Sequence, residues 1–196
     1  MIAAAALVTG LSSISPWVSR DGAVRRVSFS VGIFGAGGQA PGTMLHVVLI
    51  EPEIPPNTGN IGRLCLATGS HLHLVKPLGY SLDDRELKRA GLDYWKDVKV
   101  TVWENFEEMR AAQPAEMRFF FLTTKTKRAY WDAEFRDGDA VVFGKESKGL
   151  PEALLAANAD RCLTIPMLDN SARSLNLSTA AGVVVYEVMR QLACVR

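Results

Sequence analysis

Three polar loops of this 196-residue chain carry residue types that could do chemistry. The first loop, residues 51–63, ends in the run Pro-Pro-Asn-Thr-Gly-Asn-Ile-Gly-Arg. It offers amide donors at a helix start and the guanidinium of Arg63 one turn further on, which could hold a phosphate or stabilise a developing oxyanion. Taken alone, the loop is equally well explained as a stiff turn, a capped helix and a surface arginine.

The second loop, residues 143–151, reads Phe-Gly-Lys-Glu-Ser-Lys-Gly-Leu-Pro and combines glycines with a carboxylate. It differs from a phosphate-binding P-loop in two ways. Five residues instead of four separate Gly138 from Gly144, and Glu146 stands where a magnesium-binding Ser or Thr must follow the lysine. We therefore expect no ATP hydrolysis, because a carboxylate in a glycine turn suits a cationic or hydroxyl-bearing ligand better.

The third stretch joins Ile-Pro-Met at residues 165–167 to Arg-Ser-Leu-Asn-Leu-Ser at residues 173–178. Ser174 or Asn176 could cap the helix that follows, and the same groups could hold an adenine or a ribose. Helix capping and core packing explain each residue singly. They do not explain why three such loops occur in one chain in this order.

Apolar runs and helical stretches alternate from residue 45 onward. Strands are expected at residues 45–50, 71–75, 98–103, 118–123, 140–143 and 161–165, and helices near 58–67, 83–90, 105–112, 151–157 and 175–193. This alternation predicts an α/β fold with a mostly parallel sheet and helices on both faces. Asn57 is expected to cap the first helix, Gly69 to end it and Pro151 to begin another. The three polar loops then follow strand carboxyl ends, where open α/β sheets bind ligands.

The composition favours one domain with a short extension before it. Residues 44–196 form the expected domain, and residues 1–43 are expected to be disordered or an artefact of start-site choice, with Met44 as the natural start. Residues 35–40 match a dinucleotide-binding glycine fingerprint, but Pro41 and Gly42 leave no helix for it to open. Residues 44–196 carry a net charge of −1, so a nucleic acid would need a local basic patch.

The spacing of the cysteines and histidines predicts no metal-binding site. Cys65, Cys162 and Cys194 are widely spaced, which indicates neither a disulfide framework nor a zinc site and fits a reducing cytoplasm. The three histidines fall in expected strands: His71 and His73 share a face, and no third ligand is evident. No secretory signal or membrane span is expected.

The ordered set of three loops resembles the SPOUT class of RNA methyltransferases, specifically the TrmL-type enzymes that methylate the ribose 2′-oxygen of the tRNA wobble nucleotide, position 34. The resemblance covers residues 44–192. It implies a deep C-terminal trefoil knot with S-adenosylmethionine bent inside it, an exception to the rule that chains are not knotted. It also implies an obligate homodimer that grips the anticodon stem-loop of tRNA without a separate RNA-binding domain.

The resemblance assigns roles residue by residue. Arg63 is the implied catalytic residue, although a guanidinium stays protonated, is therefore a poor base and better suits phosphate alignment and alkoxide stabilisation. Glu51 is a reserve candidate for a carboxylate acting through water. The implied cofactor-binding residues are Leu122, Gly144, Glu146, Gly149, Ile165, Met167, Ser174, Leu175 and Asn176. The candidate RNA contacts are Lys125, Lys127, Arg128, Lys145, Lys148, Arg173 and Tyr186.

Two other functions stay open at this level. One is methylation of a different tRNA or ribosomal RNA ribose, and the other is RNA binding by a knotted protein without catalysis. Intact motifs argue against the second, because a degenerate binder would be expected to have lost Arg63 or the glycines of the second loop. In-line transfer of a sulfonium methyl depends mostly on orientation, and no metal is required.

Overall fold

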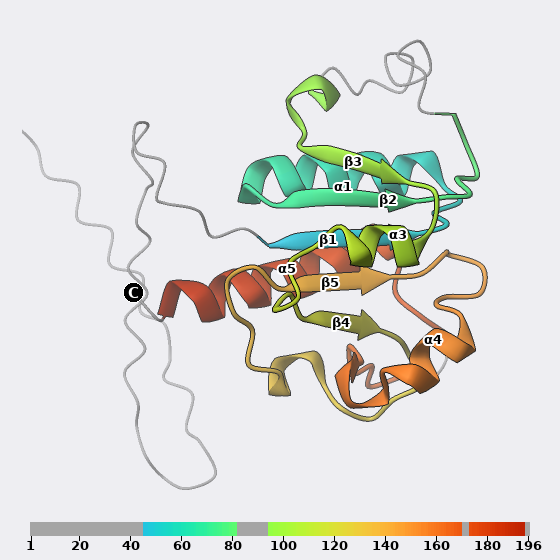
Figure 1. The fold of residues 1–196 in the computed structure, drawn as a ribbon. Helices are drawn as coiled ribbons and strands as arrows, with labels where there is room; N and C mark the ends of the chain where they lie inside the picture. The colour runs from blue at the N-terminus through green and yellow to red at the C-terminus, as the bar shows by residue number, and fades with distance from the viewer. Residues whose placement is uncertain (1–44, 82–93, 170–172, 195–196) are drawn as a thin grey trace, which may run out of the picture. The chain divides into compact units, whose positions relative to one another are not determined.

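The computed structural model describes residues 45–81, 94–169 and 173–194. The expected extension at 1–43 and the expected helix at 83–90 lie outside these residues. Six parallel strands form one sheet in the order β3-β2-β1-β5-β4-β6 (Figure 1). The strands are β1 His46–Ile50, β2 His71–Val75, β3 Val100–Trp103, β4 Phe119–Leu122, β5 Ala140–Phe143 and β6 Cys162–Leu163. The predicted α/β fold with a mostly parallel sheet is confirmed.

Helices cover both faces of the sheet, as the apolar strand sequences require. On one face lie α1 Pro55–Thr68 and α5 Leu177–Cys194, and on the other lie α3 Phe106–Ala111 and α4 Glu152–Ala157 (Figure 1). Short 3-10 turns, η1 Trp95–Asp97, η2 Tyr130–Asp132 and η3 Ala159–Arg161, lie in the connections. Among the described residues, no helix has the length and apolar character needed to cross a bilayer.

The larger core lies between the sheet and α5. Four α5 residues that recur with helical spacing are fully buried, namely Ala181, Val184, Val185 and Val188. Each buried valine contributes about 1.5–3 kcal/mol relative to exposure. This packing fixes α5 against the central strands, and it therefore fixes the loop that precedes α5.

The ends of the helices match the sequence expectations only in part. Gly69 ends α1 in the left-handed conformation, with φ of 69°, as predicted. The prediction that Asn57 caps α1 is wrong: the helix begins at Pro55, and Ile54 occupies the cap position. Proline suits the first helical turn because it has no N–H to leave unpaired and its φ is already helical. Asn57 therefore lies inside the first turn, with its side chain free for another contact.

The strand order reverses between β1 and β5, which are neighbours in the middle of the sheet. The chain leaves β1 toward α1 on one face, whereas it leaves β5 toward α4 on the other face. Such a switch point opens a crevice at the carboxyl ends of the strands and is the usual ligand-binding place of open α/β sheets. The loops that begin at Glu51 and Gly144 border this crevice.

Candidate active site

A cavity of about 500 Å³ lies at the carboxyl ends of β4 and β5, beside the first turn of α5. Its volume lies within the range of small-molecule sites. Four candidate RNA contacts also line it: Lys125, Lys145, Lys148 and Arg173. All nine implied cofactor-binding residues line this one cavity: Leu122, Gly144, Glu146, Gly149, Ile165, Met167, Ser174, Leu175 and Asn176.

Glu146 joins the second loop to the start of α1. Its carboxylate accepts hydrogen bonds from the backbone N–H groups of Glu53 at 2.8 Å and Ile54 at 3.3 Å, and from the side-chain amide of Asn57 at 2.9 Å. A negative charge here also interacts favourably with the positive end of the helix dipole. The contact is reciprocated, because the Glu53 carboxylate accepts from the backbone N–H and hydroxyl of Ser147. These hydrogen bonds lower the pKa of Glu53.

Asn176 extends this network to the third loop. Its side-chain N–H donates to the amide oxygen of Asn57 at 2.9 Å. Its own oxygen accepts from the backbone N–H groups of Ser178 and Thr179, so Asn176 caps α5, one of the two predicted alternatives. Two asparagines and Glu146 therefore tie all three loops together. The sequence analysis identified each loop but missed Asn57 as the link, because nothing in the linear sequence pairs it with residues 89 and 119 positions away.

The second loop closes tightly on itself through its glycines. A Cβ atom on Gly144 would lie 2.2 Å from the carbonyl carbon of Gly149, so a side chain does not fit there. Gly149 has φ of 70°, and its N–H donates to the carbonyl of Lys145 at 2.8 Å. The glycines thus let the backbone fold into a narrow turn that forms one wall of the cavity.

Glu51 and Lys145 face each other across the switch point. The Lys145 ammonium lies 2.5 Å from the Glu51 carboxylate, and this hydrogen bond raises the pKa of Lys145. Glu51 has φ of 51°, a left-handed conformation that is uncommon outside glycine and concentrates at functional sites. The reserve candidate for a general base is therefore engaged in an ion pair.

Arg63 does not line the cavity of its own chain. It lies on an exposed part of α1, with its guanidinium carbon 4.5 Å from the centroid of the Tyr94 ring. The candidate RNA contacts outside the cavity are also dispersed. Arg128 donates to the carbonyl of Asp160 at 2.6 Å, Lys127 lies in the loop before it, and Tyr186 is 61% exposed on α5.

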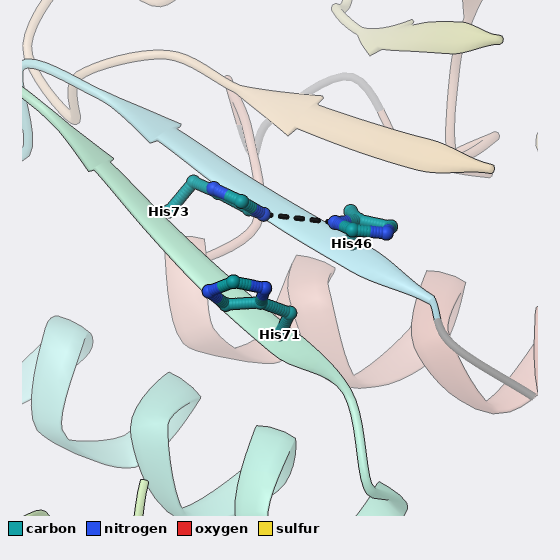
Figure 2. A group of neighbouring side chains, drawn as sticks. All are labelled: His46, His71 and His73. Atoms are coloured by element: carbon teal, nitrogen blue, oxygen red, sulfur yellow. Dashed lines mark hydrogen bonds between the residues drawn. The ribbon is translucent and has the colours of Figure 1, made fainter. Parts of the chain in front are cut away.

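The expectation that His71 and His73 have no third partner is wrong. His46, the first residue of β1, lies beside both of them (Figure 2). The parallel register pairs His46 with His71 and Val48 with His73, which places all three side chains on one face. The signal was present in the sequence as a histidine at the start of each of two neighbouring strands, but only the pairing register connects them.

An all-parallel sheet with a glycine-walled cavity at its switch point defines an open α/β protein that binds its ligand at the carboxyl ends of the strands. Within this class, residues 44–186 match the SpoU rRNA Methylase family, and the chain belongs to that family. It is 51% identical over 149 residues to the tRNA (cytidine(34)-2'-O)-methyltransferase of Methylovorus glucosotrophus, which covers 76% of this chain and 96% of the relative. It is 49% identical over 150 residues to the Escherichia coli K12 protein of the same name, which covers 76% of this chain and 94% of that protein.

Solved structures agree with this assignment. A putative RNA methyltransferase from Bacillus anthracis superposes with a TM-score of 0.72 at 49% identity, covering 76% of this chain and 94% of that one. A structure concerned with 2-OH methylation of C/U34 on tRNA also gives a TM-score of 0.72, at 46% identity, covering 77% and 97%. An AdoMet-bound rRNA methyltransferase from Sinorhizobium meliloti gives 0.66 at 25% identity, covering 76% and 57%. The sequence-based resemblance to SPOUT methyltransferases is thereby confirmed.

Proposed function

We propose that this protein transfers a methyl group from S-adenosylmethionine to the ribose 2′-oxygen of the wobble nucleotide, position 34, of tRNA. The observation that carries the proposal is the convergence of all three motif loops on one cavity, in a chain about half identical to enzymes named for this reaction. The chain spans 94–96% of the length of those relatives, so the likeness is not confined to a shared subdomain.

The cavity suits S-adenosylmethionine in size and in chemistry. Leu122, Ile165 and Leu175 offer apolar surface for an adenine ring. The hydroxyl and amide groups of the third loop offer hydrogen bonds to a ribose, and the narrow Gly144 turn keeps backbone N–H and C=O groups close to the ligand. The cofactor supplies an electrophilic sulfonium methyl, and no metal takes part in the proposed transfer. The protein's contribution is to orient the methyl acceptor in line with that methyl group.

Arg63 is the proposed catalytic residue, and a homodimer explains its position. Its guanidinium is exposed and lies away from the cavity of its own chain. In a homodimer, Arg63 of the partner subunit reaches this cavity, aligns the phosphate of the target nucleotide and stabilises the alkoxide as the 2′-hydroxyl releases its proton to water. The 2′-oxygen then forms a bond to the methyl carbon as the carbon–sulfur bond breaks, and S-adenosylhomocysteine leaves. A guanidinium stays protonated in proteins, so Arg63 is not the base itself.

Further proposals follow from membership of the SPOUT class. The C-terminal part of the domain forms a deep trefoil knot around the bent cofactor, and the protein acts in the cytoplasm. The anticodon stem-loop is contacted by Lys125, Lys148 and Arg173 at the cavity rim and by Lys127, Arg128 and Tyr186 further out. The domain consists of residues 44–196, with 1–43 as an extension. Phosphate contacts of this kind position an RNA and add salt dependence to its binding.

The decisive experiment is transfer of labelled methyl from S-adenosylmethionine to bulk tRNA by the wild type and by Arg63→Ala, with mass spectrometry of nuclease digests to locate the product. A 2′-O-methylated nucleotide 34 that disappears with Arg63→Ala supports the proposal. Methylation at another tRNA or ribosomal RNA ribose would leave the chemistry intact and overturn the substrate. Cofactor binding without methylation of either RNA would favour a non-catalytic RNA-binding protein.

The position of Arg63 is tested separately by subunit mixing. Arg63→Ala chains and Asn176→Ala chains are each expected to be inactive as homodimers. If Arg63 acts in the cavity of the other subunit, a mixed dimer contains one complete site and recovers activity. If Arg63 acts within its own chain, no mixed dimer has a complete site, and activity stays absent.

A further inference from the structure

All three histidines of the chain meet at the amino-terminal end of the sheet, on the face covered by α3. Figure 2 shows His46 on β1 with its ring directed toward His73 on β2, while His71, also on β2, lies beside them. The ring centroids of His71 and His73 are 4.1 Å apart, and those of His46 and His73 are 5.1 Å apart. One nitrogen from each ring lies within 4.8 Å of one nitrogen from each other ring.

We propose that His46, His71 and His73 form a binding site for a divalent transition-metal ion of the zinc type. Imidazole nitrogens suit zinc, copper and nickel, and three of them are enough for a zinc site whose remaining position is taken by water. Among the described residues, the group contains no carboxylate or thiol, which makes a hard cation such as magnesium a poor occupant.

The geometry of the cluster is close to that of three ligands around one ion. Zinc–nitrogen bonds of about 2.0–2.1 Å place two tetrahedral ligands roughly 3.4 Å apart. Nδ1 of His46 lies 2.8 Å from Nε2 of His73, so these two rings must separate by about half an ångström to admit the ion. Rotation of the partly buried His71 ring would bring in the third nitrogen.

The surroundings of the three rings oppose a bound cation. Burial disfavours positive charge at this place, and the charge of Lys99 acts on all three imidazoles in the same direction. We therefore expect a site of modest affinity, on the order of micromolar.

One hydrogen bond competes with the metal. The indole N–H of Trp103 donates to Nδ1 of His73 at 3.0 Å, and an indole can only donate. In the metal-free protein the His73 proton is therefore on Nε2, where it is donated to His46. A metal on Nε2 moves this proton to Nδ1, against the Trp103 N–H. The Thr101 hydroxyl lies 2.9 Å from Nε2 of His71 and can accept as well as donate a hydrogen bond. A proton on Nε2 of His71 is therefore compatible with Thr101 when the other nitrogen of that ring binds the metal.

The location indicates a stabilising role and not a catalytic one. His46 and His71 begin their strands, whereas the candidate active site lies beyond the strand ends. Strands of five residues separate the two sites by roughly 15 Å, at about 3.3 Å per residue. The bound ion ties β1 to β2 and is expected to raise Tm by several degrees when its concentration is about 100 times Kd. Methyl transfer is not expected to need it.

The test is calorimetric titration of the untagged, EDTA-dialysed full chain with Zn²⁺, with Co²⁺ titration to read the ligand field in visible absorption. We expect one ion per chain and the absorption of a tetrahedral cobalt site. His71→Gln is expected to weaken binding at least 100-fold. Trp103→Phe removes the competing donor and is expected to tighten binding roughly tenfold.

Circular dichroism and thermal melting in EDTA show whether each variant is folded before it is titrated. His71→Gln is the preferred ligand variant because His71 is only partly buried, whereas His46 and His73 are buried, so its replacement disturbs the core least. The proposal would be overturned if the folded wild type gave no heat of zinc binding and no visible absorption with cobalt. So would wild-type affinity in His71→Gln, or weaker binding in a folded Trp103→Phe. None of these results depends on methyl transfer, so failure here leaves the proposed enzymatic function untouched.

Discussion

The Arg63 guanidinium lies over the ring of Tyr94, with 4.5 Å between the guanidinium carbon and the ring centroid. The Tyr94 hydroxyl donates to the carbonyl of Gly59, one turn earlier in α1, at 2.8 Å. The next residue, Trp95, packs so closely on α1 that a Cβ on Gly62 would lie 2.6 Å from its ring. The segment that begins at Tyr94 therefore packs on α1 and also fixes the orientation of the Arg63 side chain.

Replacing Tyr94 should lower turnover through Arg63. A cation–π contact at an exposed site contributes about 0.5–1 kcal/mol, so Tyr94→Leu is expected to reduce kcat about two- to fivefold with an unchanged Kd for S-adenosylmethionine. Tyr94→Phe retains the ring and should retain most of the activity. Steady-state kinetics on tRNA measure this effect. An unchanged kcat in Tyr94→Leu, or an equal loss of kcat in Tyr94→Phe, would show that the contact of the ring with Arg63 does not support turnover.

Neutralising Glu146 should loosen the start of α1. In Glu146→Gln, an amide N–H replaces an oxygen that accepted from Glu53, Ile54 or Asn57. Leaving one of these donors unpaired is expected to cost about 1–3 kcal/mol in the free energy of unfolding and to weaken cofactor binding. Urea denaturation and calorimetry measure the two effects. Glu152→Gln is the matched control, because Glu152 forms an exposed pair with Lys125 and should leave the urea midpoint unchanged.

A methyl group on Gly144 should damage the cavity wall. The added Cβ would meet the backbone of Gly149 and Leu150 at 2.2–2.3 Å, and backbone atoms cannot move aside cheaply. We expect Gly144→Ala to lose about 1–3 kcal/mol of stability and most of its cofactor affinity. In Gly182→Ala the new Cβ meets nothing within 4 Å, and alanine favours a helix interior. That variant should bind cofactor normally, and a similar loss of binding in both variants would contradict the steric explanation.

The buried ion pair at the start of β5 should dominate the electrostatic contribution to stability. Asp139 is 2% exposed and accepts from Arg118 Nε at 2.8 Å, from Arg118 Nη2 at 2.6 Å and from the Arg136 N–H at 2.6 Å. Asp139→Ala leaves the half-buried guanidinium without its partner and is expected to cost about 3–5 kcal/mol in chemical denaturation.

The matched control for this prediction is Glu104→Ala. Glu104 forms an exposed pair with Lys76, and its loss should cost less than about 0.5 kcal/mol. If both substitutions had the same small effect, solvent would be screening the Asp139 pair despite its burial.

The sequence by itself determined the layer architecture and the site loops. Strands 71–75 and 140–143 have the predicted bounds, because turn-forming residues bound both runs: Gly69 and Pro77 lie around the first, and Gly138 and Gly144 around the second. The same argument placed the three polar loops at strand ends. Their residue types were specific enough to identify the SPOUT class, and all nine implied cofactor residues line one cavity.

Only the tertiary structure decided how distant side chains pair. Asn57 was expected to cap a helix, but folding brings it between Glu146 and Asn176, and the prolines before it start the helix instead. His46 lies beside His71 because β1 and β2, which are separated in the sequence by α1, are paired in this register in the sheet. Local sequence determines which conformations and which faces are favourable. Pairing across the sheet depends on strand order and register, which are set by the packing of the whole domain.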